Sequence, residues 1–329
     1  MSFSSSGSPP PIRLPPPAGP GDRVGVAALS GPVDAERLER GLAALRGLGF
    51  EPVVADNVGA CGGRFAGGDA ERLAAFHRLA GDADLPVIMF ARGGSGLLRV
   101  LPGIDWGLLR RRPRAYVGFS DLTPFLLAVA GRLGLAAFHG PMAAVDLARG
   151  LDDAERESLL GALAGRYPLD LRLGRGGGAA AVLRPGRASG PLLGGCLSLL
   201  AATLGTPYFP DLSGAVLFWE DTGEPPYKID RMLTHLSLSG NLDRIGGMII
   251  GHLDATEAAA GPIADTPEAR SMEAAPEWRS LIEDSLSGYS WPLVLGLDAG
   301  HGSPNLTLPL GLPARLEAGG RGGELLALG

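Results

Sequence analysis

The sequence predicts an α/β protein with a parallel sheet in its N-terminal half and a smaller, more β-rich second part. Two observations predict this class. Up to about residue 150, short apolar runs alternate with helical patterns, which is typical of βαβ units. The strand-like runs are almost continuously apolar, as expected for a sheet that is covered on both faces.

The N-terminal elements follow from hydrophobic spacing and turn residues. The apolar run 24–29 precedes a Ser-Gly-Pro turn, and Asp34 then opens a helical pattern. Leucines spaced by four, three and three residues continue this pattern to Gly49, a helix-stopping residue. By the same criteria we expect strands at 52–55, 87–90, 115–119 and 136–138, and helices at 69–79 and 123–133.

The second half of the sequence has a different pattern of predicted elements. The segment 171–189 contains three consecutive glycines and several arginines, so we interpret it as a linker or crossing. The predicted organisation is a disordered Pro/Ser-rich tail (1–21), an N-terminal domain (22–150), a connecting segment (151–189) and a C-terminal domain (190–329). In the last of these we expect helices up to 204 and at 229–238, strands at 215–219, 248–250 and 294–297, and a hairpin of 314–318 with 324–328.

Composition narrows the function classes. The 329-residue chain has a net charge of -6, and no block of Lys or Arg stands out as a nucleic-acid footprint, which argues against a nucleic-acid partner. The sequence contains no run of about 18 apolar residues, which is the pattern that would predict a membrane span. The first residues lack the pattern of a secretory signal, and Cys61 and Cys196 form no CxxC pair. We therefore expect a cytoplasmic protein, and the absence of HExxH-type spacing leaves no metal site to predict.

Three polar segments follow apolar strands and are candidates for chemistry. Ser120 lies where a strand runs directly into a helix, a position that suits a nucleophile, although a simple helix cap also explains a serine there. Arg92-Gly93-Gly94-Ser95-Gly96 leaves backbone N–H groups free for an anion or for half of an oxyanion hole, although a plain tight turn is the simpler interpretation. Glu220, Asp221 and Glu224 follow a buried strand, where one carboxylate could orient a histidine or all could be solvated.

Among the five histidines, His301 has the most loop-like surroundings. Glycines on both sides allow another segment or a ligand to approach it closely. For the other four, a structural role is the better interpretation; they are His77, His139, His235 and His252.

Taken together, these segments resemble the LD-carboxypeptidase family, the serine peptidases of murein recycling. The resemblance runs from about Asp22 to Gly311, in order. It rests on residues 21–24, 30–32, 65–69, 92–94, 118–123, 139–142, 194–195, 220–225, 227–233 and 300–302, and on Asn305 and 308–311.

The resemblance implies a catalytic triad of Ser120, Glu220 and His301, and a serine mechanism that needs no metal or cofactor. It also implies a flavodoxin-like N-terminal sheet, a swivelling C-terminal domain and a homodimer. The backbone N–H groups of Gly94 and Asp121 are expected to form the oxyanion hole, with Gly93 and Ser95 near the substrate.

The implied substrate is a murein tetrapeptide, from which the enzyme would release the terminal D-Ala. The group that binds the terminal carboxylate stays open between the helix N-terminus after Ser120 and a nearby arginine. Three departures from the family pattern affect the substrate more than the triad: Ser95 in place of an aromatic residue, Cys196 in place of Asn, and His252-Leu253-Asp254 in place of a phenylalanine-containing segment.

Three other functions remain as alternatives. A relative of the microcin self-immunity peptidases would cleave peptidyl-aminoacyl nucleotides. A non-catalytic muropeptide-binding protein would keep the three residues as a relic. A nucleotide-binding α/β protein would bind phosphate with the glycine loops, although these loops do not contain a complete phosphate-binding motif.

Overall fold

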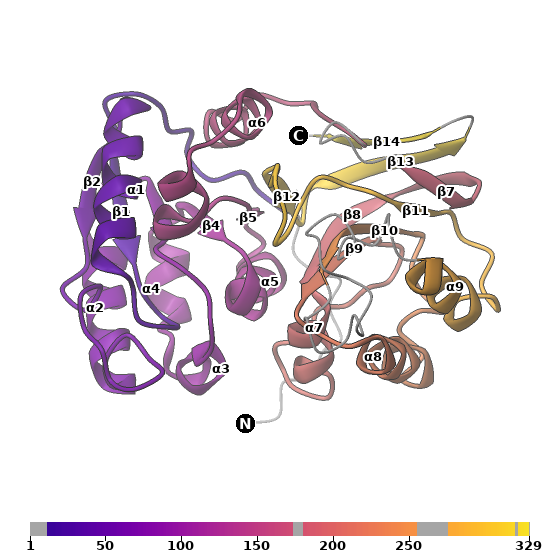
Figure 1. The fold of residues 1–329 in the computed structure, drawn as a ribbon. Helices are drawn as coiled ribbons and strands as arrows, with labels where there is room; N and C mark the ends of the chain where they lie inside the picture. The colour runs from indigo at the N-terminus through magenta and orange to yellow at the C-terminus, as the bar shows by residue number, and fades with distance from the viewer. Residues whose placement is uncertain (1–11, 174–179, 255–275, 320–321, 329) are drawn as a thin grey trace.

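The computed structural model describes residues 12–173, 180–254, 276–319 and 322–328, and it contains two sheets. Figure 1 shows the N-terminal half of the chain, in indigo to magenta, beside the C-terminal half, in pink to yellow. This arrangement confirms the predicted fold class: a parallel sheet in the N-terminal part and a separate β-rich C-terminal part.

The first sheet has the strand order of flavodoxin-like proteins. Its strands follow the order β12-β5-β4-β3-β1-β2, in which β1 to β5 are parallel and β12 is antiparallel to β5. The strands β3 and β4 are buried throughout, which explains their continuous apolar sequence. The bounds are β1 (Arg23–Ala27), β2 (Glu51–Val54), β3 (Val87–Phe90), β4 (Ala115–Gly118), β5 (Ala137–His139) and β12 (Leu308–Leu310).

Helices between these strands pack around the first sheet. The predicted first helix begins after Asp34, whose side chain accepts the Arg37 backbone N–H and so caps the helix. The helix after Ser120 coincides with the predicted one. The bounds are α1 (Ala35–Gly47), α2 (Asp69–Gly81), α3 (Leu97–Val100), α4 (Trp106–Arg111), α5 (Thr123–Leu133), a one-turn π-helix (Ala143–Leu147) and α6 (Asp153–Leu163).

The second sheet mixes parallel and antiparallel pairs. Its order is β6-β14-β13-β8-β9-β10-β11-β7, with β8 to β11 parallel and the remaining pairs antiparallel. The strands are β6 (Leu169–Arg172), β7 (Ala181–Arg184), β8 (Gly186–Cys196), β9 (Val216–Thr222), β10 (Gly247–Asp254), β11 (Leu293–Leu295), β13 (Pro313–Gly319) and β14 (Gly322–Ala327); the helices are α7 (Leu197–Thr203), α8 (Pro226–Leu238) and α9 (Pro276–Ser285).

Two expectations about connecting segments need correction. Residues 12–21 were predicted as part of a disordered tail, but Ala18 is buried and donates a backbone hydrogen bond to Leu163, while Arg13 pairs with Leu135. Residues 1–11 lie outside the described residues. The segment 171–189 was interpreted as a linker, but β7 and part of β8 lie in it, because each strand has a partner in the second sheet.

Candidate active site

Ser120 lies at a sharp turn between β4 and α5. Its φ is 61°, and it is the one non-glycine residue with a positive φ in the described part of the chain. A side chain in this region is uncommon and costs free energy, so strain here often marks a functional position. The helix-cap explanation does not hold, because Phe119 is the residue at the cap position and no side chain forms a cap hydrogen bond there. The geometry is that of a nucleophile elbow.

The C-terminal part brings a histidine and a glutamate to this serine. His301 Nε2 lies 3.0 Å from Ser120 Oγ, and His301 Nδ1 lies 2.6 Å from Glu220 Oε2. Glu220 is fully buried, and its Oε2 also accepts the backbone N–H of His301 at 3.3 Å. A carboxylate that accepts the Nδ1 proton leaves Nε2 free to accept the serine proton.

The electrostatics of the His–Glu pair favour an ionised Glu220. Burial raises the pKa of Glu220, but the charge of His301 and its hydrogen bonds outweigh burial, so the pKa lies below its usual value. Burial lowers the pKa of His301, but Glu220 outweighs it, so the pKa of this imidazole lies above 6.5. His301 therefore gains basicity from Glu220.

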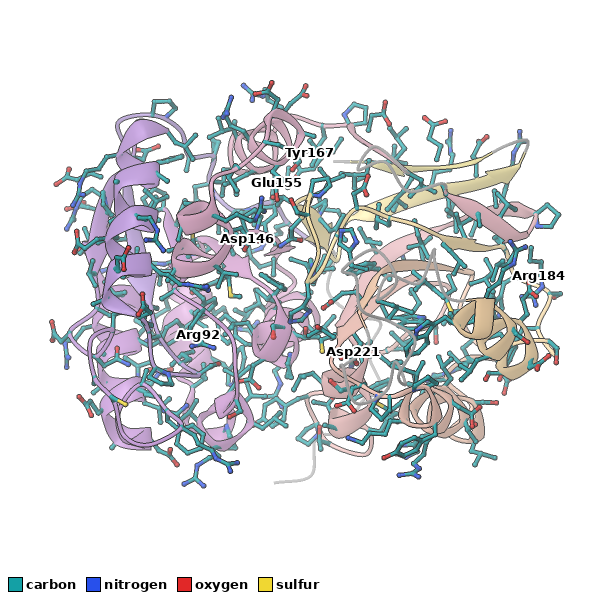
Figure 2. All side chains as sticks on the ribbon, viewed as in Figure 1. Arg92, Asp146, Glu155, Tyr167, Arg184 and Asp221 are labelled. Atoms are coloured by element: carbon teal, nitrogen blue, oxygen red, sulfur yellow. The ribbon has the colours of Figure 1, made fainter. Side chains whose placement is uncertain are left out.

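The alternation of side chains along β9 decides which of the three acidic candidates faces His301. Glu220 bonds His301. Its neighbour Asp221, labelled in Figure 2, accepts the Ser198 backbone N–H at 2.7 Å, at the start of α7. Burial first, and then the nearby Glu220 charge, raise the pKa of Asp221 to about 6. Glu224 pairs with Lys228 at 2.9 Å.

The Gly93–Gly94 turn lies against Ser120. A Cβ atom added to Gly93 would lie 2.9 Å from Ser120 Oγ and 3.4 Å from the Asp121 nitrogen, so only glycine allows this approach. Among the described residues, the backbone N–H groups of Gly94 and Asp121 form no hydrogen bond. They are available to a negatively charged oxygen beside Ser120.

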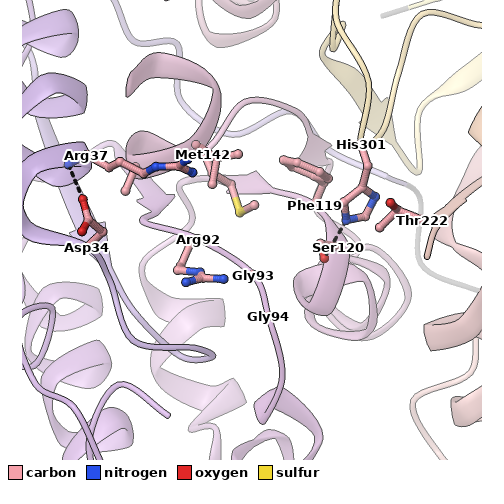
Figure 3. Close-up of a pocket in the computed structure, with 12 residues that line it drawn as sticks. Asp34, Arg37, Arg92, Gly93, Gly94, Phe119, Ser120, Met142, Thr222 and His301 are labelled. Atoms are coloured by element: carbon pink, nitrogen blue, oxygen red, sulfur yellow. Dashed lines mark hydrogen bonds between the residues drawn. The ribbon is translucent and has the colours of Figure 1, made fainter. Parts of the chain in front are cut away.

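The site opens into a cavity of about 520 Å³ (Figure 3). Gly93 and Gly94 line it, whereas Ser95 is exposed and does not. The cavity is formed at the carboxyl ends of β1, β3, β4 and β5, as expected for ligand sites in open parallel sheets. Its lining consists of Asp34, Arg37, Arg92, Gly93, Gly94, Phe119, Ser120, Met142, Ala144, Val145, Thr222 and His301.

A buried polar network behind His301 was not predicted. Asn305 is fully buried, and its Oδ1 accepts the Gly300 N–H at 2.9 Å. Its Nδ2 donates to Asp146 at 3.3 Å, and its backbone N–H donates to Glu155 at 2.7 Å. Asn305 is one of the residues on which the family resemblance rests, but its contacts with residues more than 140 positions away become visible only in the fold.

Within the described ranges, none of the four histidines predicted to be structural forms a hydrogen bond with the Ser120 hydroxyl. His77 accepts a backbone N–H from Asp105, and His252 Nε2 bonds the Pro304 carbonyl at 2.8 Å. His139 is fully buried against Phe119 and Phe218. Within the described ranges, no three His, Cys, Asp or Glu side chains are grouped closely enough to hold a metal ion.

No helix in the described ranges combines the length and the apolar character needed to cross a bilayer.

A strained serine at the edge of a flavodoxin-like sheet, with a histidine and a buried glutamate from the C-terminal part, defines a candidate serine hydrolase. Comparison with known proteins gives the family. Residues 24–140 match the LD-carboxypeptidase N-terminal domain and residues 189–316 match its C-terminal domain. The chain therefore belongs to the LD-carboxypeptidase family.

Individual relatives cover nearly the whole chain. A protein of Streptomyces coelicolor named as a carboxypeptidase is 42% identical, with 91% of each chain covered. The murein tetrapeptide carboxypeptidase of Pseudomonas aeruginosa is 30% identical, over 90% of this chain and 93% of the relative. The microcin C7 self-immunity protein of Escherichia coli is 26% identical, over 90% and 92%.

A solved structure supports the same family. The muramoyltetrapeptide carboxypeptidase of Oxalobacter formigenes superposes with a TM-score of 0.78 and 28% identity, over 93% of this chain and 98% of the other.

Proposed function

We propose that this protein is a serine carboxypeptidase that hydrolyses the L,D-peptide bond of a murein tetrapeptide and releases its terminal D-Ala. The observation that carries the proposal is the chain of hydrogen bonds from Ser120 through His301 to Glu220, built on a strained serine beside two free backbone N–H groups. Membership in a family that includes murein peptide carboxypeptidases supports the choice of substrate.

In the proposed reaction, Ser120 Oγ attacks the scissile carbonyl carbon while His301 Nε2 takes its proton. Glu220 holds the Nδ1 proton and stabilises the imidazolium. The N–H groups of Gly94 and Asp121 bind the oxyanion, and one such donor is worth about 3–4 kcal/mol of transition-state stabilisation.

When the intermediate collapses, the C–N bond breaks and the D-Ala amine takes the proton from His301. Water then hydrolyses the acyl-serine by the same steps in reverse. No step of this mechanism uses a metal ion.

Mass spectrometry of the purified protein with murein tetrapeptide tests the proposal. We expect the wild type to release one D-Ala, with or without chelator, and Ser120→Ala to retain a folded structure but lose turnover. Substantial turnover by Ser120→Ala would exclude the serine mechanism. Loss of wild-type turnover in chelator, restored by added metal, would exclude a metal-free one.

A second candidate is hydrolysis of a peptidyl-aminoacyl nucleotide, which the similarity to the microcin C7 self-immunity protein favours. Cleavage of such a conjugate but not of the tetrapeptide would select it. A third candidate is a non-catalytic muropeptide-binding protein. Binding of the tetrapeptide without cleavage of either compound would select that.

The proposal also includes a cytoplasmic location and a homodimer. The free cysteines, exposed Cys61 and buried Cys196, fit a reducing compartment. Cell fractionation tests the location, and size-exclusion chromatography with light scattering tests the dimer.

A further inference from the structure

We propose that Arg92 binds the terminal carboxylate of the substrate and so restricts cleavage to the last peptide bond. This inference rests on the proposed carboxypeptidase function. An enzyme that removes a single C-terminal residue has to recognise a free carboxylate, and two kinds of group near Ser120 offer a positive partner: the N-terminus of the following helix and an arginine.

The helix N-terminus is already occupied. The Leu122 N–H donates to the Phe119 carbonyl at 3.2 Å, and the Thr123 N–H donates to the Ser120 carbonyl. The Thr123 hydroxyl accepts the Cys196 N–H at 3.1 Å, and Thr123 is buried. The Leu122 and Thr123 N–H groups are therefore not free to bind a carboxylate, and the Asp121 N–H is assigned to the oxyanion.

Arg92 is placed beside the oxyanion donors. One of its terminal nitrogens, Nη1, donates to the Pro32 carbonyl at 2.9 Å, which fixes the side chain. Its Nη2 would lie 3.8 Å from a Cβ added to Gly94, so the guanidinium lies against the turn that faces Ser120 (Figure 3). Nε and Nη2 form no hydrogen bond with any residue in the described ranges. These two N–H groups form the fork that binds a carboxylate with two parallel hydrogen bonds.

The reach of the substrate favours Arg92 over the other cationic side chains of the cavity. The terminal carboxylate is one residue beyond the scissile carbonyl, about 3.8 Å along the chain, so its partner has to lie next to the oxyanion donors. Arg92 is two residues from Gly94. Arg37 belongs to α1, is exposed, and lies in the same cavity without an acidic partner for its guanidinium among the described residues. It is therefore the rival.

The remaining charges near the cavity are committed to other partners. Arg40 pairs with Glu36 at 2.5 Å, and Arg149 pairs with the buried Glu155 at 2.6 Å. Asp34, the acidic residue of the lining, accepts the backbone N–H of Arg37 at 2.8 Å. An anion can therefore bind to Arg92 without breaking an existing ion pair.

The test is a comparison of two substrates: the murein tetrapeptide with a free terminal carboxylate and the same peptide with a terminal amide. For the wild type we expect kcat/KM to be higher for the acid. In Arg92→Gln we expect kcat/KM for the acid to fall about a hundredfold. It should fall much less for the amide, so the acid-to-amide ratio should approach one, whereas Arg92→Lys should keep part of the preference.

Two controls make the result interpretable. Thermal melting and covalent labelling of Ser120 by a fluorophosphonate show whether Arg92→Gln keeps its fold and its active serine, and Arg37→Gln tests the rival. An unchanged acid-to-amide ratio in a folded, labelled Arg92→Gln, or a ratio that collapses in Arg37→Gln instead, would overturn the assignment to Arg92 alone. A wild type that cleaves neither peptide would overturn the proposed function, and the inference with it.

Discussion

At the scale of single residues, the backbone decides which polar side chains can act. The sequence offered three carboxylates after one strand, and alternation along β9 turns Glu220 to His301 and Asp221 to α7. The triad could be predicted from the family resemblance. The strain at Ser120 could not, because a positive φ at a serine depends on how β4 and α5 are joined in the fold.

The raised pKa of His301 predicts the pH dependence of the reaction. A general base acts in its neutral form, so kcat/KM should rise with pH on the acid side, with a midpoint above 6.5. Glu220 holds the pKa above that value, against the opposing effect of burial. Glu220→Gln should therefore move the midpoint to lower pH and reduce kcat about 10⁴-fold, as loss of the orienting carboxylate does in other triads.

Glu224→Gln is the matched control for this pH profile, since Glu224 follows the same strand but pairs with Lys228. It should leave the midpoint in place. A midpoint that stays unchanged in Glu220→Gln would contradict the assigned coupling between Glu220 and His301.

At the scale of elements, the local sequence pattern predicts those helices and strands that are stabilised mainly by local contacts. The helix at 69–79 and the strand at 87–90 occur close to their predicted positions, because the apolar residues of the helix follow one period and the strand is an unbroken apolar run. The short strands β6, β7 and β12 were missed, as was the longer β8. Three or four residues carry little periodic signal, and these strands exist because distant partners supply their hydrogen bonds.

The loop that carries His301 depends on a glycine. Gly300 has a φ of +112°, and a Cβ atom there would lie 2.6 Å from Glu220 Cγ and Oε2. Gly300→Ala should therefore displace the glutamate or the histidine. Because a displacement of about 1 Å in a catalytic group costs about a hundredfold in rate, we expect kcat to fall by at least that factor.

Gly288→Ala is the corresponding control, since a Cβ atom at Gly288 meets no other atom within 4 Å. Kinetics of the two purified variants, with melting curves, would show whether the loss is local to the site. Equal kcat values for the two variants would mean that the loop tolerates the extra methyl group.

At the scale of the whole molecule, the active site exists only because the two parts of the chain are joined in a fixed position. Ser120 follows β4 of the first sheet, whereas Glu220 lies in β9 of the second. The strand β12, which comes after His301 in sequence, returns to the first sheet and pairs with β5. The sequence suggested a two-part chain but did not predict this return, because the residues of a strand do not identify the strand with which it pairs.

The Asn305 network holds the His301 loop against the N-terminal part. Asn305→Ala would leave the buried Gly300 N–H without its acceptor and remove a donor from Asp146. Burial raises the pKa of Asp146, and the Asn305 hydrogen bond is among the contacts that lower it, so the ionised form becomes less favourable in the variant. Each buried group left without a partner costs about 1–3 kcal/mol of stability.

The prediction for Asn305→Ala is therefore twofold: a lower free energy of unfolding and a lower kcat, because His301 is no longer held at its distance from Ser120. Asn241→Ala is the matched control. Asn241 is also buried, but its partners are Ser239 and Arg244, away from the site. Urea unfolding and kcat measured on both variants separate the two effects. If both lose stability and only Asn305→Ala loses kcat, the network positions His301; if kcat is unchanged in Asn305→Ala, β12 and the paired strands hold the two parts in register without it.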